Sequence, residues 1–373
     1  MNILVFSWRD SKHPLAGGAE QVMHMHMKGW IEAGHKVTFF TSRPKNTPAS
    51  EALDGVEIIR RGSQYLSVHI FAFFWYLFGK RVKFDFVVDQ FHGWPFFTPL
   101  YVGVSKLAVI QELTKEVWFK YPLPLRLNYI LGLIGYLVEP LFFLIYRNTK
   151  FMTGSESAKM ELQTVGIKEK NITIVPHGVV LNIPKKRPQK EKKKTIIFLG
   201  ALAEDKGVKD AIKVFGLLNK QGDYQFWVVG KGDDSYLKYL KKFSNSLGLK
   251  EKTIFFGFVS QKKKFELLAK SHVMVNPSIR EGWGLVNIEA NAVGVPVVAY
   301  KSPGLVDSVK NGKSGILVDK NTPEALADAI AKILDDEKLL RGLSKGSLDW
   351  SKNFSWEESK RLSLNLINKI TND

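Results

Sequence analysis

The 373-residue sequence contains no cysteine, which excludes disulfides, thiolate metal sites and a cysteine nucleophile and is consistent with a reducing compartment. It also lacks any Asp-x-Asp pair, the arrangement that commonly holds a metal ion against a diphosphate. A nucleotide phosphate loop ending in NGKSG (311–315) would need glycine at position 307, where Asp307 stands. His24 and His26 are two residues apart on a predicted helix, so they point to different faces. We therefore predict no metal site.

Long apolar runs are also scarce. The opening MNILVFSW has too short an apolar run, and no preceding positive charge, for a signal peptide. Residues 65–79 are shorter than the ~20 residues that a membrane span needs, and Glu139-Pro140 interrupts residues 129–146. We expect no transmembrane span and favour two buried helices. The alternative is that these segments turn an apolar face to a bilayer, with nearby Lys and Arg meeting anionic lipid.

The positive charge is concentrated in one short segment. Of the net charge of +18, one third lies in KKRPQKEKKK (185–194), and residues 1–184 and 195–373 carry +6 each. Because there is no extended basic stripe, a dedicated nucleic-acid-binding protein is excluded. We interpret the segment as a solvated hinge between domains, and attraction to polyanions is the alternative.

Short apolar runs alternate with segments of helical length, which predicts parallel sheets covered on both faces. The predicted strands are 2–6, 36–40, 56–59, 84–88, 106–110, 150–153 and 172–175 before the basic segment, and 195–200, 225–230, 253–257, 272–276 and 295–300 after it. The fold class is therefore α/β, with two doubly wound, Rossmann-like domains that bind ligands at the carboxyl ends of their strands. We expect domains at 1–184 and 195–354, with the helix in 355–373 crossing back to the first.

The stretch SIREGWGLVNIEANAVGVPVVAY (278–300) carries the strongest candidate site. Two carboxylates, Glu281 and Glu289, bracket a Gly-Trp-Gly turn that enters a predicted helix. The free amides of a helix start bind anions, and Glu289 lies about one and a half turns inside the helix. Such a layout suits a nucleotide sugar, with a diphosphate between two hydroxyl-bearing groups. The alternative is an ordinary helix entry with an acid near the positive end of the helix dipole.

The same stretch resembles the Glu-x7-Glu signature of the retaining glycosyltransferases of family 4 (glycosyl transferases group 1), which have the GT-B fold. Other segments are similar to further motifs of that family, in the same order and over nearly the whole chain: 14–42, 154–179, 198–212, 255–260, 301–318 and 354–359. The resemblance implies two Rossmann-like domains facing a central cleft. The first would be the acceptor side, and the second would bind the nucleotide sugar.

The resemblance also implies roles for individual residues. Glu289 should accept hydrogen bonds from the ribose, Glu281 should meet hydroxyls of the transferred sugar, and Lys206 should stabilise the leaving diphosphate. The resemblance places His92 near the reacting sugar, and the alternative is a loop histidine whose hydrogen bonds are satisfied within the protein. The implied catalytic residues are His92, Lys206 and Glu281, and the implied donor-binding residues are Gly17, Gly18, Lys206, Arg280, Glu281, Gly282, Trp283, Gly284, Leu285 and Glu289.

Three positions depart from the family pattern. Ala201 stands where an arginine usually contacts the diphosphate, which removes one charge-assisted contact, and Arg280 and Lys231 are the candidates to replace it. Asp307 stands where glutamate is common. His177 takes the place of an asparagine.

The expected function is metal-independent transfer of a hexosyl group, with retention, from a nucleotide-diphosphate sugar such as a UDP-sugar. No cofactor is expected. The expected acceptor is a glycan, lipid-linked or of the cell envelope, and the expected location is the cytoplasm, with contact to the anionic inner face of the membrane and none to nucleic acid. The alternative is a GT-B binding module that has lost turnover and is attracted to polyanions or anionic membrane.

Overall fold

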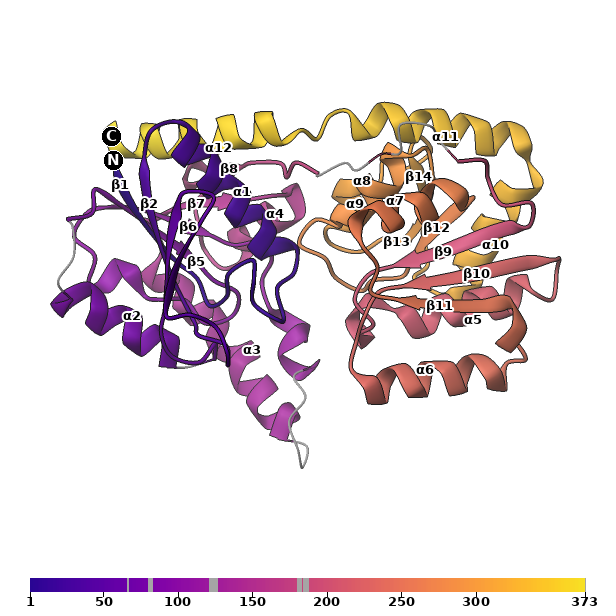
Figure 1. The fold of residues 1–373 in the computed structure, drawn as a ribbon, viewed down its shortest axis with the longest axis horizontal. Helices are drawn as coiled ribbons and strands as arrows, with labels where there is room; N and C mark the ends of the chain where they lie inside the picture. Colours follow the sequence, from indigo (N-terminus) through magenta and orange to yellow (C-terminus); the bar gives the residue numbers. More distant parts are fainter. Residues whose placement is uncertain (66, 80–82, 121–126, 180–182, 184–187, 373) are drawn as a thin grey trace. The chain divides into compact units, whose positions relative to one another are not determined.

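The computed structural model describes the chain except residues 66, 80–82, 121–126, 180–182, 184–187 and 373. The chain forms two compact units (Figure 1). Unit 1 comprises Met1–Gly178 together with Ser355–Asp373, and unit 2 comprises Val179–Phe354. The C-terminal segment thus belongs to unit 1, and the division after Gly178 comes somewhat earlier than the expected boundary at 184.

Unit 1 is built on an eight-stranded sheet in the order β3-β4-β2-β1-β5-β6-β7-β8. Its strands are β1 (Asn2–Phe6), β2 (Lys36–Thr41), β3 (Ser50–Leu53), β4 (Val56–Arg60), β5 (Phe86–Gln90), β6 (Ser105–Val109), β7 (Lys150–Thr153) and β8 (Ile172–Ile174). All neighbouring strands are parallel except β3 and β4, which are antiparallel. The edge strand β3 was not predicted from the sequence, because its residues, SEAL, alternate between exposed and half-buried and form no apolar run.

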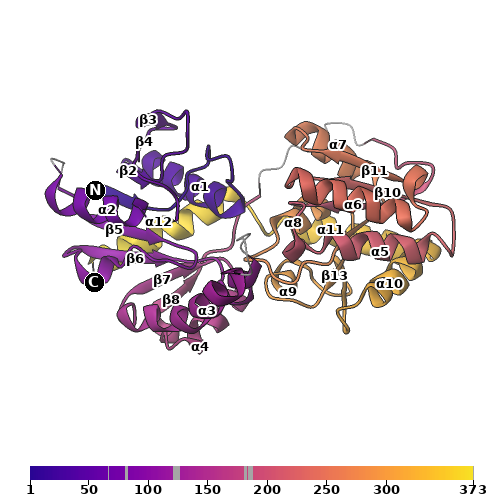
Figure 2. The same ribbon diagram turned by 90° about the horizontal axis from the view of Figure 1, so that it is seen from below.

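Helices cover both faces of this sheet. On one face, Ile3 and Val5 pack with residues of α1 (Gly18–Glu32) and α12 (Trp356–Asn372). Trp30 Nε1 donates to Ser363 Oγ at 3.1 Å and joins these two helices, which lie side by side in Figures 1 and 2. On the other face, Leu4 packs with α2 (Ser67–Phe78), and β6 and β7 pack with α3 (Leu127–Ile145) and α4 (Glu156–Thr164).

Unit 2 contains a six-stranded, fully parallel sheet in the order β11-β10-β9-β12-β13-β14. Its strands are β9 (Lys194–Leu199), β10 (Tyr224–Val229), β11 (Thr253–Gly257), β12 (Val273–Asn276), β13 (Val297–Tyr300) and β14 (Gly315–Val318). Its α-helices are α5 (Val208–Leu218), α6 (Asp234–Ser246), α7 (Gln261–Lys270), α8 (Leu285–Ala292), α9 (Leu305–Ser308), α10 (Pro323–Asp335) and α11 (Glu337–Ser351). Ile196 and Phe198 pack on the α5 and α10 side, and Ile197 and Leu199 pack on the α7 and α8 side. These two sheets confirm the predicted α/β class.

Two apolar segments differ from the expectation of buried helices. Both form helices, α2 and α3, but their outer sides are exposed. Pro140 lies inside α3 rather than ending it. Among the helices of the described residues, none is both long and apolar enough to cross a membrane.

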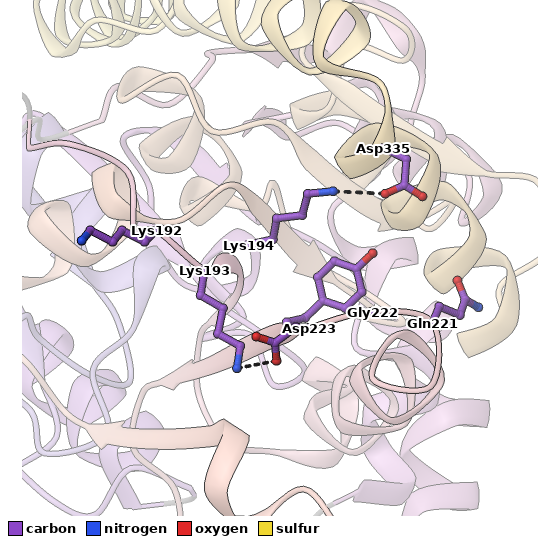
Figure 3. A pocket seen from close by; sticks show the side chains of 8 residues that line it. Lys192, Lys193, Lys194, Gln221, Gly222, Asp223 and Asp335 are labelled. Carbon is purple, nitrogen blue, oxygen red and sulfur yellow. Dashed lines mark hydrogen bonds and ion pairs between the residues drawn. The ribbon is translucent and has the colours of Figure 1, made fainter.

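The described part of the basic segment, residues 188–194, lies against unit 2 rather than forming a free linker. Lys190 Nζ donates to the carbonyl oxygen of Ser271 at 2.6 Å, and the amide of Glu191 donates to the carbonyl oxygen of Lys270 at 3.0 Å. Two further lysines form ion pairs: Lys193 with Asp223 at 2.6 Å and Lys194 with Asp335 at 3.1 Å. The residues of both pairs, drawn in Figure 3, line a depression of about 630 Å³. Residues 185–187 lie outside the described residues.

Candidate functional site

The loops that follow β9 and β10 approach each other more closely than side chains would allow. A Cβ on Gly230, whose φ is 148°, would lie 1.8 Å from the carbonyl oxygen of Gly200. The amide of Leu202 donates to the carbonyl oxygen of Lys231 at 2.8 Å. Glycine is therefore required at Gly230. Ala201 lies exposed on the first of these loops, at the carboxyl end of the sheet.

A buried chain of amide and hydroxyl groups fixes the start of α8. Asn276, the last residue of β12, donates from Nδ2 to Asn287 Oδ1 at 2.8 Å, and Asn287 Nδ2 donates to Ser308 Oγ at 2.9 Å. Gly284 caps α8 with φ 80°, and a Cβ there would lie 2.8 Å from Ser308 Oγ. Leu285 is thus the first helical residue. The amides of this turn and the positive end of the helix dipole form an environment suited to an anion.

Lys206 and Glu281 lie together at this edge of the sheet. Lys206 ends a 3-10 helix (Glu204–Lys206), and its Nζ is 3.0 Å from Glu281 Oε2 and 3.3 Å from Asp205 Oδ2. The same Nζ donates to the carbonyl oxygen of Arg280 at 3.3 Å. The two loops are also joined through Ser278, whose Oγ donates to the carbonyl oxygen of Asp205 at 3.2 Å. A cation and a carboxylate are thereby held next to the start of α8.

Glu289 lies inside α8 with its carboxylate buried and only half satisfied. Lys264, on α7, donates from Nζ to Glu289 Oε1 at 2.5 Å. Glu289 Oε2 is buried and has no hydrogen-bond partner among the described residues. Burial raises the pKa of this carboxyl group, and the charge of Lys264 opposes that rise. Because an unpaired buried acceptor is costly, this oxygen is suited to accept a hydrogen bond from a ligand hydroxyl.

The side chains of Trp283 and Arg280 are buried in unit 2. The Trp283 ring is buried against Val179, Ile288 and Phe354, with its centroid 4.7 Å from that of Phe354. The ring therefore anchors the Gly-Trp-Gly turn, and only its backbone is suited to contact a ligand. Arg280 is largely buried as well.

Gly17 and Gly18 stand at the start of α1 in unit 1. The amide of Gly17 donates to Glu20 Oε2 at 2.6 Å, and Glu20 Oε1 is 2.9 Å from Arg9 Nε. A Cβ on Gly17 would meet only Glu20 Oε2, at 3.6 Å, and the φ of −127° suits any residue. Nothing within unit 1 therefore demands glycine at position 17.

His92 lies in the loop after β5, with its ring centroid 6.0 Å from that of Trp8. Asp89, buried at the end of β5, holds the following segment. It accepts hydrogen bonds from the Thr98 amide at 3.3 Å, from Thr98 Oγ1 at 2.8 Å and from Tyr146 OH at 2.5 Å. Burial raises the pKa of Asp89.

The remaining histidines singled out in the sequence belong to the interior or to ion pairs. His24 Nε2 is 2.8 Å from Asp54, whereas His26 is buried, so the two point to different faces as predicted. His177 Nε2 lies 2.7 Å from Gln111 Oε1, and burial lowers the pKa of His177 to about 4. Burial also lowers the pKa of His26, to about 3.

Two family models match adjoining parts of the chain. Glycosyltransferase Family 4 matches residues 16–182, and Glycosyl transferases group 1 matches residues 180–350. The chain belongs to glycosyltransferase family 4. Sucrose-phosphate synthase from Thermosynechococcus elongatus has a similar structure, with a TM-score of 0.81 at 20% identity over 99% of this chain and 98% of that one. These matches confirm the predicted family and the GT-B fold.

The chain is also similar to a second solved structure and to a curated protein. Anabaena HepE, solved with UDP and glucose, has a TM-score of 0.72 at 14% identity over 98% of this chain and 99% of that one. The capsular polysaccharide biosynthesis glycosyltransferase CapM of Staphylococcus aureus is 27% identical over 263 residues, which are 63% of this chain and 66% of CapM. The first curated relatives that the chain matches are covered over 40–60% of their own lengths.

The sequence did not identify Lys264, which contacts Glu289 in unit 2, or Asp89, which holds the segment after His92 in unit 1. Lys264 is the last of three consecutive lysines, and nothing in that run distinguishes it from its neighbours. Asp89 stands in an apolar strand three residues before His92, and a buried acid at a strand end is a signal that could have found it.

Proposed function

We propose that this chain transfers a hexosyl group from a nucleotide-diphosphate sugar to an acceptor hydroxyl, with retention at the anomeric carbon. The observation that carries the proposal is the buried, unpartnered Oε2 of Glu289 on the helix whose first turn adjoins the Lys206–Glu281 pair. A nucleotide sugar has hydroxyl groups on both sides of its diphosphate. Glu289 and Glu281 are hydrogen-bond acceptors for those hydroxyl groups, and the helix start with Lys206 is the anion site between them.

Each residue has a defined part in the proposed site. Glu289 accepts hydrogen bonds from ribose hydroxyls, and the amides from Trp283 to Leu285 bind the distal phosphate. Lys206 exchanges part of its pairing with Glu281 for the diphosphate and stabilises the charge that develops on the leaving group. Glu281 then accepts hydrogen bonds from the transferred sugar. In this proposal the leaving group is stabilised without a required metal ion or cofactor.

In the proposed reaction the leaving group departs from, and the acceptor bonds to, the same face of the anomeric carbon. The bond to the phosphate oxygen breaks, the bond to the acceptor oxygen forms, and the departing phosphate oxygen takes the acceptor proton. His92, Gly17 and Gly18 are proposed contacts of the reacting sugar. The freedom of Gly17 from any steric demand within unit 1 supports a ligand-related reason for glycine there.

For the substrates we propose a UDP-sugar donor and a lipid-linked or envelope glycan acceptor, at the cytoplasmic face of an anionic membrane. The UDP bound to the structurally similar HepE supports UDP as the first donor to test. The function in the name of CapM, capsular polysaccharide biosynthesis, supports an envelope glycan.

A binding panel tests the donor site. Calorimetry with UDP, GDP, ADP and their common sugar conjugates should show saturable binding to one nucleotide class. Glu289→Ala should weaken that binding at least about tenfold, since charged hydrogen bonds are worth roughly 1.5–3 kcal/mol. Glu337→Ala, on the exposed start of α11, is the matched control and should leave affinity unchanged. Absence of binding to every nucleotide, with the protein folded, would overturn the proposal.

A binding module without turnover is the second candidate, and Ala201 is the observation that favours it. This candidate predicts salt-sensitive binding to any polyanion through residues 185–194. The ion pairs of Lys193 and Lys194 count against it, because part of that charge is already neutralised within unit 2 (Figure 3). Replacing Lys192, Lys193 and Lys194 by Gln should abolish polyanion binding under this candidate and leave sugar transfer intact under the first.

A further inference from the structure

Large exposed apolar side chains are concentrated on two helices of unit 1. On α2 they are Ile70, Phe71, Phe74, Leu77 and Phe78, and on α3 they are Tyr129, Ile130, Leu131, Leu133, Ile134, Tyr136, Leu137, Leu141, Leu144 and Ile145. Phe78 is 75% exposed and Leu137 is 60% exposed. We call these fifteen side chains the apolar face. A concentration of exposed apolar side chains of this kind marks an interaction site in a folded protein.

Both helices cover the same face of the sheet, so their outer sides belong to one side of unit 1. Leu4 pairs in register with Val87, and both pack beneath α2. The residues in register further along the sheet are Phe6, Asp89, Ala108 and Phe151, one on each of β1, β5, β6 and β7. Of these, Ala108 and Phe151 pack beneath α3. Because alternate residues of a strand share a face, this register places α2 and α3 on the same layer.

The inner side of α3 packs closely against the segment 114–119 that precedes it. Cβ atoms on Gly132 and Gly135 would lie 2.8 Å from Phe119 and 2.5 Å from Trp118, so only glycine allows the preceding segment to pack against the helix. Glu139 accepts hydrogen bonds from the amides of Thr114 and Lys115 and from Trp118 Nε1, at 2.7–2.9 Å. The one charged residue of α3 is therefore buried in a structural role, and the exposed positions from 129 to 145 are uncharged.

The shape of the exposed surface favours lipid over a protein partner. At ~100° per residue, the exposed positions of α3 span roughly 220° of the helix circumference. A protein surface covers one stripe of a helix, whereas a helix that is apolar around most of its circumference is suited to immersion in lipid. In Figure 1 the first half of α3 extends away from the sheet, and its side chains Tyr129, Ile130 and Leu137 are each about 60% exposed.

Length and charge point to insertion into one leaflet. The uncharged run 127–138 is about 18 Å long at 1.5 Å per residue, close to half of a hydrocarbon core of ~30 Å. In the sequence, Lys80 and Arg81 follow α2 closely, Arg126 precedes α3 and Arg147 follows it. Tyr129 and Tyr136 add side chains that favour the interface between lipid and water.

We propose that the apolar face docks unit 1 on an anionic lipid bilayer, with the first half of α3 inserted into one leaflet. Acyl chains cover the outer sides of α2 and α3, and the positive charge that the sequence places beside both helices favours anionic headgroups. This inference deepens the membrane contact in the proposed function by naming its surface and depth. It does not depend on sugar transfer.

The absence of native cysteine allows a direct test with one label per molecule. Leu133→Cys and Phe258→Cys each carry an environment-sensitive fluorophore, and Phe258, exposed on unit 2, is the matched control. Addition of vesicles of phosphatidylcholine with phosphatidylglycerol should shift the emission of the label at 133 to shorter wavelength and protect it from iodide. The label at 258 should stay accessible. Equal quenching of both labels with vesicles would overturn the proposal.

Flotation with vesicles measures the same docking without a label. Binding should be stronger to anionic than to zwitterionic vesicles and should decrease with salt without disappearing, because the apolar contribution is not screened. The triple variant L133S/I134S/L137S should lower the partition coefficient at least about 100-fold, as loss of three buried apolar side chains implies. The control I254S/F258S on unit 2 should bind as the parent chain does.

Two further outcomes separate this inference from its rivals. Calorimetry should show equal nucleotide binding by the triple variant and the parent chain. A variant that no longer binds vesicles but still binds nucleotide would show that only the docking surface is lost. A parent chain that binds vesicles but no nucleotide would contradict the proposed donor site and leave the docking proposal standing. A label at 133 that is already protected without lipid, in a chain that sediments as a dimer, would overturn the proposal in favour of a second copy of this chain.

Discussion

Lys264 Nζ lies 2.5 Å from one carboxylate oxygen of Glu289, and the other oxygen of that carboxylate is buried without a partner. The lysine thus does two things at once. It holds the carboxylate in one orientation, and its charge lowers a pKa that burial raises. One oxygen stays available for a ligand, while the charge of Lys264 opposes the rise in pKa that burial causes.

Lys264→Gln should weaken nucleotide binding and move its pH dependence. Without the lysine the pKa of Glu289 rises further, so a smaller fraction of the carboxylate is ionised at a given pH. Affinity in the parent chain should fall as the pH is lowered, and in the variant this fall should begin at a higher pH, which calorimetry from pH 5.5 to 8.5 measures. Lys263→Gln, whose lysine pairs with Glu266, is the neighbouring control. Superimposable profiles for the variant and the parent chain would contradict the assignment.

Ala201→Arg should strengthen donor binding. Position 201 is exposed on the loop after β9, and an arginine there adds a charge-assisted contact to a diphosphate. Such a bond is worth roughly 1.5–3 kcal/mol, so the nucleotide dissociation constant should fall by about tenfold or more. Ala201→Gln adds comparable length without charge and should change little. An unchanged dissociation constant in the arginine variant would show that the diphosphate does not reach this loop.

Gly284→Ala should destabilise unit 2 and weaken nucleotide binding together. The φ of 80° and the 2.8 Å approach to Ser308 Oγ strain any side chain at position 284, at a cost of roughly 1–3 kcal/mol. Gly342→Ala, in α11 with open space around its Cβ, should instead stabilise by about 0.5–1 kcal/mol. Urea unfolding gives both values. Equal stability of the two variants would remove the argument for glycine at the α8 cap.

The free energy of unfolding of unit 1 should fall as the pH drops below about 6.5. His26 has a pKa of about 3 in the folded chain and 6.5 as its ordinary value. The unfolded chain therefore binds a proton that the folded chain excludes, at ~1.4 kcal/mol per pH unit. Stability from this group is complete above pH 6.5 and is lost towards pH 3. His177, with a pKa of about 4, acts in the same direction.

The variant His26→Leu isolates this contribution. Between pH 6 and 4.5 the variant should take up about one proton fewer on unfolding than the parent chain. The slope of its unfolding free energy against pH should therefore be smaller by ~1.4 kcal/mol per pH unit. Hydrogen exchange in α1 and α12 follows unit 1 specifically. A slope that is unchanged in His26→Leu would show that His26 is protonated inside the folded unit.

Much of the fold could be predicted because strand and helix patterns are local. The segments 2–6, 150–153 and 253–257 coincide with β1, β7 and β11, and the other predicted strands differ from the observed ones by one or two residues. Two strands were missed. The residues of β3 form no apolar run, and the short apolar run GILV of β14 was not identified as a strand. Glu281 and Glu289 also flank the start of α8 as predicted. They are eight residues apart in one continuous loop and helix, so their separation depends on local structure alone.

The sequence by itself determined the alternation of elements, the glycine-bounded start of α8 and the family to which the chain belongs, since each depends on neighbouring residues or on their order. Only the tertiary structure decided what surrounds them. Lys264 meets Glu289 because α7 packs beside α8, and Asp89 meets Tyr146 because α3 covers the end of β5. The apolar composition of α2 and α3 predicted burial equally well for their inner and outer sides. Which sides the sheet covers is decided by packing, and packing leaves the outer sides exposed.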